Sequence, residues 1–114
     1  MNFGNNDAEF RAGSLLLRFV RDRGQEFLDL ASVKAPLECY QFNDVQVAFG
    51  WTSTEAVFAR EEPLPLELVV ALLAKHFNEL NEAFSRDWEA TRPRLETAAK
   101  ERAQSFMKIF QGKN

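Results

Sequence analysis

Two prolines, Pro63 and Pro65, divide the chain into halves that differ in the spacing of their apolar residues. No helix can run through this point, because proline lacks a backbone N–H and clashes with the preceding helical turn. Over residues 14–32 apolar side chains alternate with a period of two, whereas after Pro65 they recur at helical spacing. Such segregation is typical of an α+β fold. We therefore predict an N-terminal antiparallel β-hairpin or small sheet with a C-terminal pair of amphipathic helices packed on it.

The chain has 114 residues, the length of one domain, and its 46% of hydrophobic residues exclude a disordered chain. Most of the 11 phenylalanines fall at core spacing, so we interpret them as core and not as a ligand site. Within the single domain, residues 1–114, we expect a loose lead-in over residues 1–13, a β-hairpin over residues 14–32, a mixed segment over residues 33–64 and the helical pair over residues 65–111.

The turn at Arg23 and Gly24 fixes the register of the predicted hairpin. Gly24 supplies the positive φ that a two-residue turn requires. A three-residue loop would oppose charged and apolar side chains, so we reject it. The two-residue turn pairs side chains by kind, namely Arg21 with Glu26, Arg18 with Asp29, Phe19 with Leu28, Leu17 with Leu30 and Val20 with Phe27. The face that we expect to meet the core carries Leu15, Leu17, Phe19, Leu28 and Leu30.

The segment between the hairpin and the prolines gives conflicting signals. Residues 33–37 form a connector broken by Pro36. Apolar residues alternate over residues 45–51, as in a strand, whereas Asn43 followed by Gln46 resembles a helix capping box and Gly50 suits the position after a helix end. For residues 43–51 we favour a short helix and keep the strand as the alternative. We expect residues 55–60 to be a short extended piece.

The C-terminal half carries two helical patterns. Pro65 suits a first helical turn, and Ser85 is a candidate N-cap for the second helix. Pro93 marks either a kink in that helix or its true start. The first apolar stripe consists of Leu66, Val69, Val70, Leu73, Phe77, Leu80 and Phe84. The second consists of Trp88, Leu95, Ala98, Ala99, Ala103, Phe106, Ile109 and Phe110.

Charge is distributed unevenly along the chain, whose formal net charge is -3. Residues 38–67 hold several carboxylates against Arg60 alone, and residues 91–114 are predominantly basic. In one interpretation the basic residues complement the end of a helix dipole and the acidic segment is a solvated loop. In the other, the acidic segment docks a basic protein partner. The overall acidic excess argues against nucleic acid as a partner.

The chain lacks the residue sets that catalysis or metal binding needs. His76 is the only histidine, and Glu79 is a weak candidate to orient it as a base. Cys39 is the only cysteine, which excludes an internal disulfide, and the glycines form no phosphate-binding loop. We therefore predict no enzyme, no cofactor and no metal site. The sequence shows neither a signal peptide nor a stretch of roughly 20 apolar residues. We therefore predict a cytoplasmic protein with no membrane partner.

One run of residues resembles a known group of proteins. Residues 17–29, LRFVRDRGQEFLD, join two strands through an Arg-Asp-Arg-Gly-Gln turn, and residues 40–45, YQFNDV, follow them. This arrangement resembles an element of small bacterial proteins, some of which are similar to the immunity proteins of polymorphic toxin systems. The resemblance covers residues 14–50. It implies a short helix that begins in residues 40–45 and a protein that neutralises a toxin by binding it.

Two functions agree with these observations. The first is a non-catalytic protein-binding module of the immunity type, which blocks a basic toxin domain or another protein. The second is a self-associating structural or regulatory module, such as a homodimer, because the two apolar stripes offer a broad surface. Trp51 is either an exposed interface anchor or a partly buried core residue. The candidate partner-binding residues are Arg21, Asp22, Arg23, Gln25, Trp51, Glu61 and Glu62.

Overall fold

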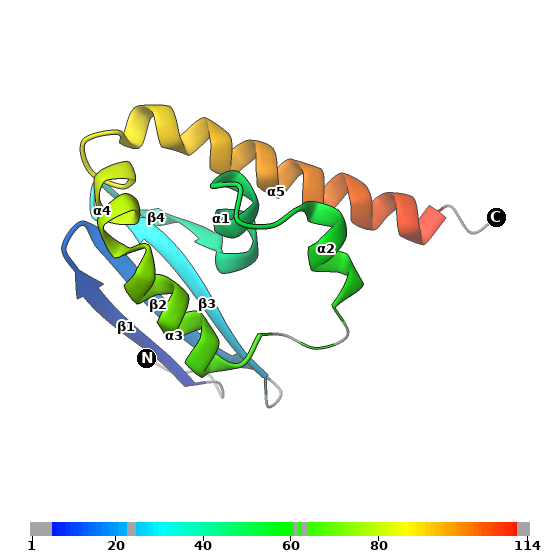
Figure 1. Ribbon diagram of the computed structural model, residues 1–114, viewed down its shortest axis with the longest axis horizontal. Coiled ribbons are helices and arrows are strands. Elements are labelled where there is room, and N and C mark those ends of the chain that lie inside the picture. Colours follow the sequence, from blue (N-terminus) through cyan, green and yellow to red (C-terminus); the bar gives the residue numbers. More distant parts are fainter. Residues whose placement is uncertain (1–5, 23–24, 61, 63, 112–114) are drawn as a thin grey trace.

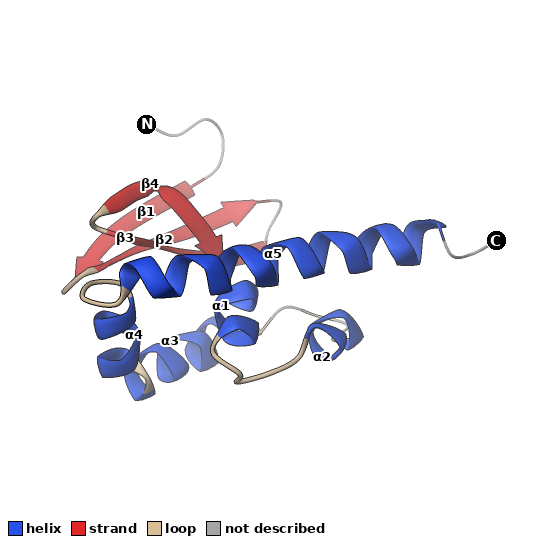
Figure 2. Ribbon diagram, turned by 90° about the horizontal axis from the view of Figure 1, so that it is seen from above, coloured by secondary structure: helices blue, strands red, loops and turns tan. Residues whose placement is uncertain are grey.

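The computed structural model describes residues 6–22, 25–60, 62 and 64–111. The strands in these residues are β1 (Asn6–Ala12), β2 (Leu15–Asp22), β3 (Gln25–Ser32) and β4 (Ala35–Gln41). The helices are α1 (Phe42–Ala48), α2 (Thr54–Ala59), α3 (Leu66–Lys75), α4 (Phe77–Ala83) and α5 (Trp88–Gln111). The strands form one antiparallel sheet in the order β1-β2-β3-β4, and the helices lie on one of its faces (Figure 1, Figure 2). The predicted α+β fold is thereby confirmed.

The register of β2 and β3 is the predicted one. Arg21 lies opposite Glu26, Arg18 opposite Asp29, and the apolar residues face one another as expected. The turn residues 23–24 lie outside the described part of the chain. The predicted core face is also confirmed, because Leu15, Leu28 and Leu30 are buried and Leu17 and Phe19 pack against them.

The prediction of a loose lead-in is wrong for residues 6–12, which form β1. β1 pairs with β2 along its length and ends with Ala12 opposite Leu15. The turn that follows needs a glycine at position 13, because Gly13 has a φ of 60° and a Cβ there would lie 2.5 Å from Oδ1 of Asn81. The pattern missed this strand because backbone pairing satisfies N–H and C=O groups whether or not the side chains are apolar.

The prediction of a connector at residues 33–37 is wrong, because residues from Ala35 onward form β4. β4 lies at the edge of the sheet. Pro36 is tolerated there, because no strand lies on the outer side of β4 and the missing N–H therefore removes no hydrogen bond between strands. The short helix favoured for the following residues is confirmed as α1. The strand alternative is therefore excluded.

The C-terminal end of α1 is defined by backbone hydrogen bonds. The predicted end is confirmed, because Gly50 has a φ of 77° and donates its N–H to the Val47 carbonyl at 3.0 Å. Trp51 donates its N–H to the Gln46 carbonyl at 2.8 Å, which completes a Schellman motif. The predicted capping box is wrong, because the helix begins before Asn43 and no side chain caps it.

The prediction of an extended piece at residues 55–60 is wrong, because α2 occupies Thr54–Ala59. Ser53 caps this helix, since its Oγ accepts a hydrogen bond from the Ala56 N–H at 3.1 Å. A helix of this length is too short to show a helical period in the sequence. The cap was therefore the only local signal for α2.

The first apolar stripe of the C-terminal half belongs to two helices, α3 and α4, and not to one. The break lies at His76, whose φ of -107° and ψ of 17° depart from helical values. Pro65 is the residue before α3 and does not lie in its first turn. α5 starts at Trp88 and contains Pro93, so the proline does not mark the start of the helix. The predicted helical pair is thus a set of three helices.

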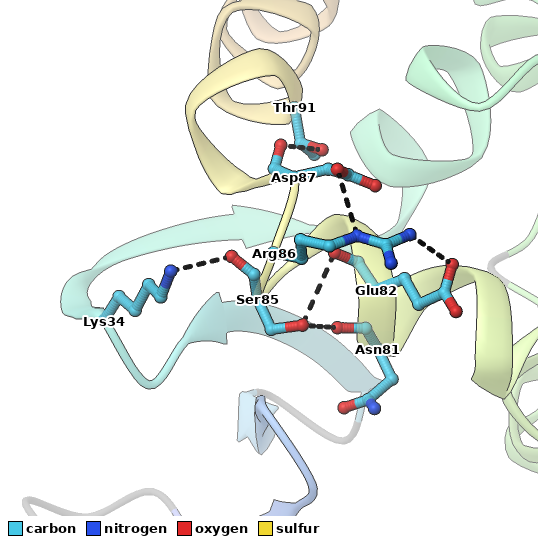
Figure 3. A network of polar contacts seen from close by, with 7 residues as sticks. All are labelled: Lys34, Asn81, Glu82, Ser85, Arg86, Asp87 and Thr91. Atoms are coloured by element: carbon cyan, nitrogen blue, oxygen red, sulfur yellow. Dashed lines mark hydrogen bonds and ion pairs between the residues drawn. The ribbon is translucent and has the colours of Figure 1, made fainter.

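The turn between α4 and α5 is fastened to the turn between β3 and β4 (Figure 3). Lys34 donates from Nζ to the Ser85 carbonyl at 2.9 Å. The buried Ser32 donates from Oγ to the Phe84 carbonyl at 2.6 Å. Ser85 does not cap α5 as predicted, because its Oγ donates back to the Asn81 carbonyl at 2.6 Å. These bonds close one end of the sheet with the helical layer.

The core lies between the sheet and the helices. Its fully buried large side chains include Leu15, Leu30, Val45, Leu80, Phe84 and Leu95. They come from β2, β3, α1, α4, the turn after α4, and α5, so both layers contribute to the core. Among the helices of the described residues, none has the length and apolar character needed to cross a membrane.

Candidate partner-binding site

An open cavity of about 330 Å³ lies at the end of the sheet where β2 and β3 are joined. We call it the tip groove. It is bounded by the end of the hairpin, by the junction of β4 with α1 and by the start of the helical half. Its apolar lining residues are Val20, Phe27, Leu28, Phe42, Leu64 and Val69, and its polar lining residues are Glu26, Asp29, Gln41 and Asn43.

The tip groove exists because β4 is shorter than its neighbour β3. β4 ends at Gln41, which lies opposite Asp29, and the chain then turns into α1. In the part of the chain that the structure describes, no strand therefore pairs with residues 26–28 on this side of β3. Leu64 and Val69 line the other side, since the start of α3 lies beside the end of the hairpin (Figure 1).

A cluster of aromatic rings supports the tip groove from within the protein. Phe42, which lines the groove, is only 5% exposed and packs edge-on against Trp51 with ring centroids 6.3 Å apart. Trp51 also contacts Phe49 at 5.7 Å and stacks on His76 at 3.9 Å. Trp51 is therefore half-buried in this cluster. This burial agrees with the interpretation of Trp51 as a partly buried core residue, and Trp51 packs against Phe42.

His76 is held on two sides at the break between α3 and α4. Its ring face lies against Trp51, and its Nδ1 lies 3.2 Å from Oε1 of Glu79. The carboxylate suggested by the sequence thus orients the imidazole, and the ring is packed against an indole. Within the described residues, no group of three or more His, Cys, Asp or Glu side chains could hold a metal ion.

The acidic segment and the basic C-terminal region pair with one another. Arg102 of α5 binds the buried Asp44 of α1, with 3.0 Å between Nε and Oδ1. Arg92 of α5 lies 3.4 Å from Oε1 of Glu38 on β4. Two carboxylates of the segment that was predicted to dock a partner are therefore neutralised within the chain. The first interpretation of the charge distribution, a helix dipole complemented by basic residues and a solvated acidic loop, does not explain these two ion pairs.

Tyr40 adds a second link between β4 and α5. Burial raises the pKa of its hydroxyl, and the nearby carboxylates of Glu96 and Glu38 raise it further. The hydroxyl lies 3.4 Å from Oε2 of Glu96 and donates to it. Because β4 is held in this way, the junction of β4 with α1 has a fixed position at the edge of the tip groove.

Of the predicted residues at the hairpin tip, Arg21 lies beside the tip groove, because it contacts the groove-lining Glu26. Arg21 and Glu26 form an ion pair of 2.7 Å, and about half of each side chain is exposed. Glu26 also lines the groove. Asp22 lies opposite Gln25 in the pairing of β2 with β3, one step nearer the turn. Arg23 lies outside the described residues.

Of the two predicted acidic residues before α3, Glu62 lies in the described part of the chain. Glu62 is exposed and precedes the groove-lining Leu64 by two positions. Glu61 lies outside the part of the chain that the structure describes. The fold thus brings the hairpin tip and the segment before α3 together across one groove, although they are far apart in the sequence.

Sequence reasoning missed the residues that shape the tip groove, above all Gln41, Phe42 and Val69. The only available signal was the conflict between strand and helix patterns near residue 43, which marks the place where β4 gives way to α1. Comparison of the chain with protein-family models, curated proteins and solved structures gives no match.

Proposed function

We propose that the chain is a non-catalytic protein-binding module that holds a basic partner protein at the tip groove, as an immunity-type protein holds its toxin. The observation that carries this proposal is the composition of the groove. Of the described residues that line it, two are carboxylates, Glu26 and Asp29, and none is lysine or arginine. The exposed Glu62 adds a further negative charge beside Leu64.

The groove has the anatomy of an interface centre. Its apolar residues form a recess for one or two side chains of a partner, and its polar residues surround them, as in the core and rim of protein interfaces. Binding energy at such interfaces is concentrated in a few anchors that enter recesses of this kind. The support of Phe42 by Trp51 keeps the recess open before a partner arrives.

Co-expression with candidate partners tests this proposal. The candidates are basic, toxin-like proteins encoded beside the gene for this chain in its own genome. We expect the chain to relieve the toxicity of one of them. Glu26→Lys should abolish this protection, because like charges brought together across an interface weaken binding by at least about tenfold. Glu89→Lys, which makes the same charge change on an exposed side chain of α5, should leave it intact.

The proposal fails if no neighbouring product is neutralised, or if the two lysine variants protect equally well. Thermal unfolding of both variants serves as the control for folding. Each replaces an exposed carboxylate, so neither should lose more than about 1 kcal/mol of stability.

A second function, self-association, is favoured by a separate observation. Large apolar side chains are exposed on α3 and near the end of α5, namely Leu66, Leu68, Val70, Phe106 and Met107. Exposed apolar clusters of this kind are typical of interaction surfaces. Sedimentation at several concentrations distinguishes the two functions, because a concentration-independent monomer would exclude self-association.

A further inference from the structure

The backbone of β3 offers hydrogen-bonding groups to the tip groove, as the pairing of β2 with β3 shows. In two antiparallel strands, the residues that lie opposite one another form pairs of two alternating kinds. In one kind, the two residues exchange backbone hydrogen bonds. In the other kind, the N–H and C=O groups of both residues point away from the partner strand. Val33, which follows β3, donates its N–H to the carbonyl of Ser14, which precedes β2, at 3.0 Å. Ser14 and Val33 are therefore a hydrogen-bonded pair. Every second pair toward the tip is then a bonding pair.

Counting along the register identifies which groups point outward. The bonding pairs include Arg18 with Asp29 and Val20 with Phe27. Arg21 and Glu26 are an outward-pointing pair, so the Glu26 N–H and C=O point away from β2. β4 ends opposite Asp29 and does not reach Glu26. The backbone of Glu26 therefore faces the tip groove without a paired strand among the described residues.

We propose that the tip groove binds an extended segment of the partner protein, which adds to the sheet alongside residues 26–28 of β3 and continues the line of β4. This inference rests on the proposed function and specifies how the partner is held. Strand addition of this kind obtains affinity from main-chain hydrogen bonds and specificity from the recesses that alternate side chains enter. The tip groove supplies both features on one sheet edge.

The side chains of the groove define what the added segment must carry. Glu26 and Leu28 are two positions apart, so they lie on the same face of β3. Leu28, Phe42 and Val69 line an apolar recess on this face, beside the Glu26 carboxylate. The segment should therefore carry an apolar residue opposite Leu28 and a lysine or arginine opposite Glu26. Asp29 places a second carboxylate on the other face of the strand.

Arg21 competes with the partner for the Glu26 carboxylate, to which it is bound at 2.7 Å. A basic residue of the added segment must share or displace Arg21. Substitutions of the two residues should therefore have opposite effects on the affinity for a basic segment. Removal of the arginine should strengthen binding of a basic segment, and reversal of the Glu26 charge should weaken it.

A synthetic peptide tests the proposal with the full chain. The peptide has a central valine, a lysine two positions to either side and threonine elsewhere, so that it matches the groove in either strand direction. We expect it to bind and to slow hydrogen exchange of the Glu26 amide, measured by nuclear magnetic resonance. The Phe27 amide, which is bonded to β2, should be unchanged. Arg21→Ala should raise the affinity and Glu26→Lys should lower it at least about tenfold.

Backbone methylation of the peptide provides the decisive control. One peptide is N-methylated at the valine and lysines, and another at the threonines. Because alternate residues of an added strand bond to its neighbour, one of the two should lose binding and the other should retain it. The proposal is overturned if both bind equally, if the lysine peptide does not bind, or if a glutamate version binds as well.

The outcomes also separate this inference from the proposed function. If Glu26→Lys abolishes toxin neutralisation but the bound peptide leaves the Glu26 amide unprotected, the partner binds at the groove without strand addition. If the peptide adds as a strand but no neighbouring protein is neutralised, the proposed function fails and the peptide-binding edge remains. Protection of the Glu26 amide at high protein concentration alone would identify a second copy of the chain as the occupant and overturn the inference.

Discussion

Replacing Arg102 with alanine should destabilise the protein by about 2–4 kcal/mol, because it leaves a buried carboxylate without its counter-charge. Asp44 retains 4% exposure of its side chain, and three nitrogen–oxygen contacts of 3.0, 3.2 and 3.3 Å join it to Arg102. Removal of one partner of a buried pair typically costs about 3–5 kcal/mol. Arg102 keeps 36% exposure, so solvent screening places the expected cost about 1 kcal/mol below this range.

The same helix offers a matched control. Arg92 lies 3.4 Å from Glu38, but both side chains are well exposed to solvent. An exposed pair of this kind contributes little to stability, because solvent screens it. Arg92→Ala and Arg102→Ala change the same residue type on α5, so the difference between them reports the burial of the carboxylate partner.

Urea unfolding, followed by circular dichroism, measures both variants. With a slope of about 1–3 kcal/mol per molar urea, Arg102→Ala should lower the midpoint by about 1–2 M and Arg92→Ala by a few tenths. Equal losses in the two variants would refute the reasoning from burial. Asp44→Leu combined with Arg102→Met should recover most of the loss, because a buried pair can be replaced by apolar side chains of similar volume.

Three further outcomes follow from the structure. The absorbance of tyrosinate should show that Tyr40 titrates above the ordinary tyrosine pKa, and Glu96→Gln should lower this pKa. Because the native hydroxyl keeps its proton where the unfolded chain loses it, this contribution to stability is complete below about pH 10 and is lost as the pH rises through the higher native pKa. Gly50→Ala should cost about 1 kcal/mol in chemical unfolding, because its φ of 77° is strained for alanine but no atom lies within 4 Å of the added Cβ. Gly13→Ala should cost more in the same assay, since its Cβ would also collide with Asn81, and equal losses would contradict the assigned contact.

The register of the hairpin could be predicted because it is determined by neighbours in the sequence. Only one two-residue turn places Arg21 opposite Glu26 and Phe19 opposite Leu28, and the structure has this pairing. The end of α1 at Gly50 was predictable for the same reason, since a Schellman motif involves residues within one helical turn.

The remaining elements depend on contacts between distant parts of the chain. β1 forms because β2 offers it a free edge, and the polar residues of β1 carry no local sign of that pairing. The apolar stripe after Pro65 has helical spacing throughout, yet the helix breaks at His76, where Trp51 stacks on the imidazole. No pattern within residues 66–84 indicates a tryptophan from another segment. The tip groove was missed for the same reason, because it is formed by five segments of the chain.

In the folded protein, charged residues of the acidic segment pair with charged residues of the basic segment. Asp44 holds α1 against α5, and Glu38 holds β4 against the same helix. The junction between β4 and α1 lies between these two ion pairs, and it is there that the sheet edge opens and Phe42 enters the tip groove. The ion pairs between the acidic and basic segments therefore hold the edge of the proposed binding site, whereas Glu26 is the carboxylate proposed to meet a basic partner. A loss of either ion pair should consequently affect partner binding through the position of Phe42, without any change in the charge that the groove presents.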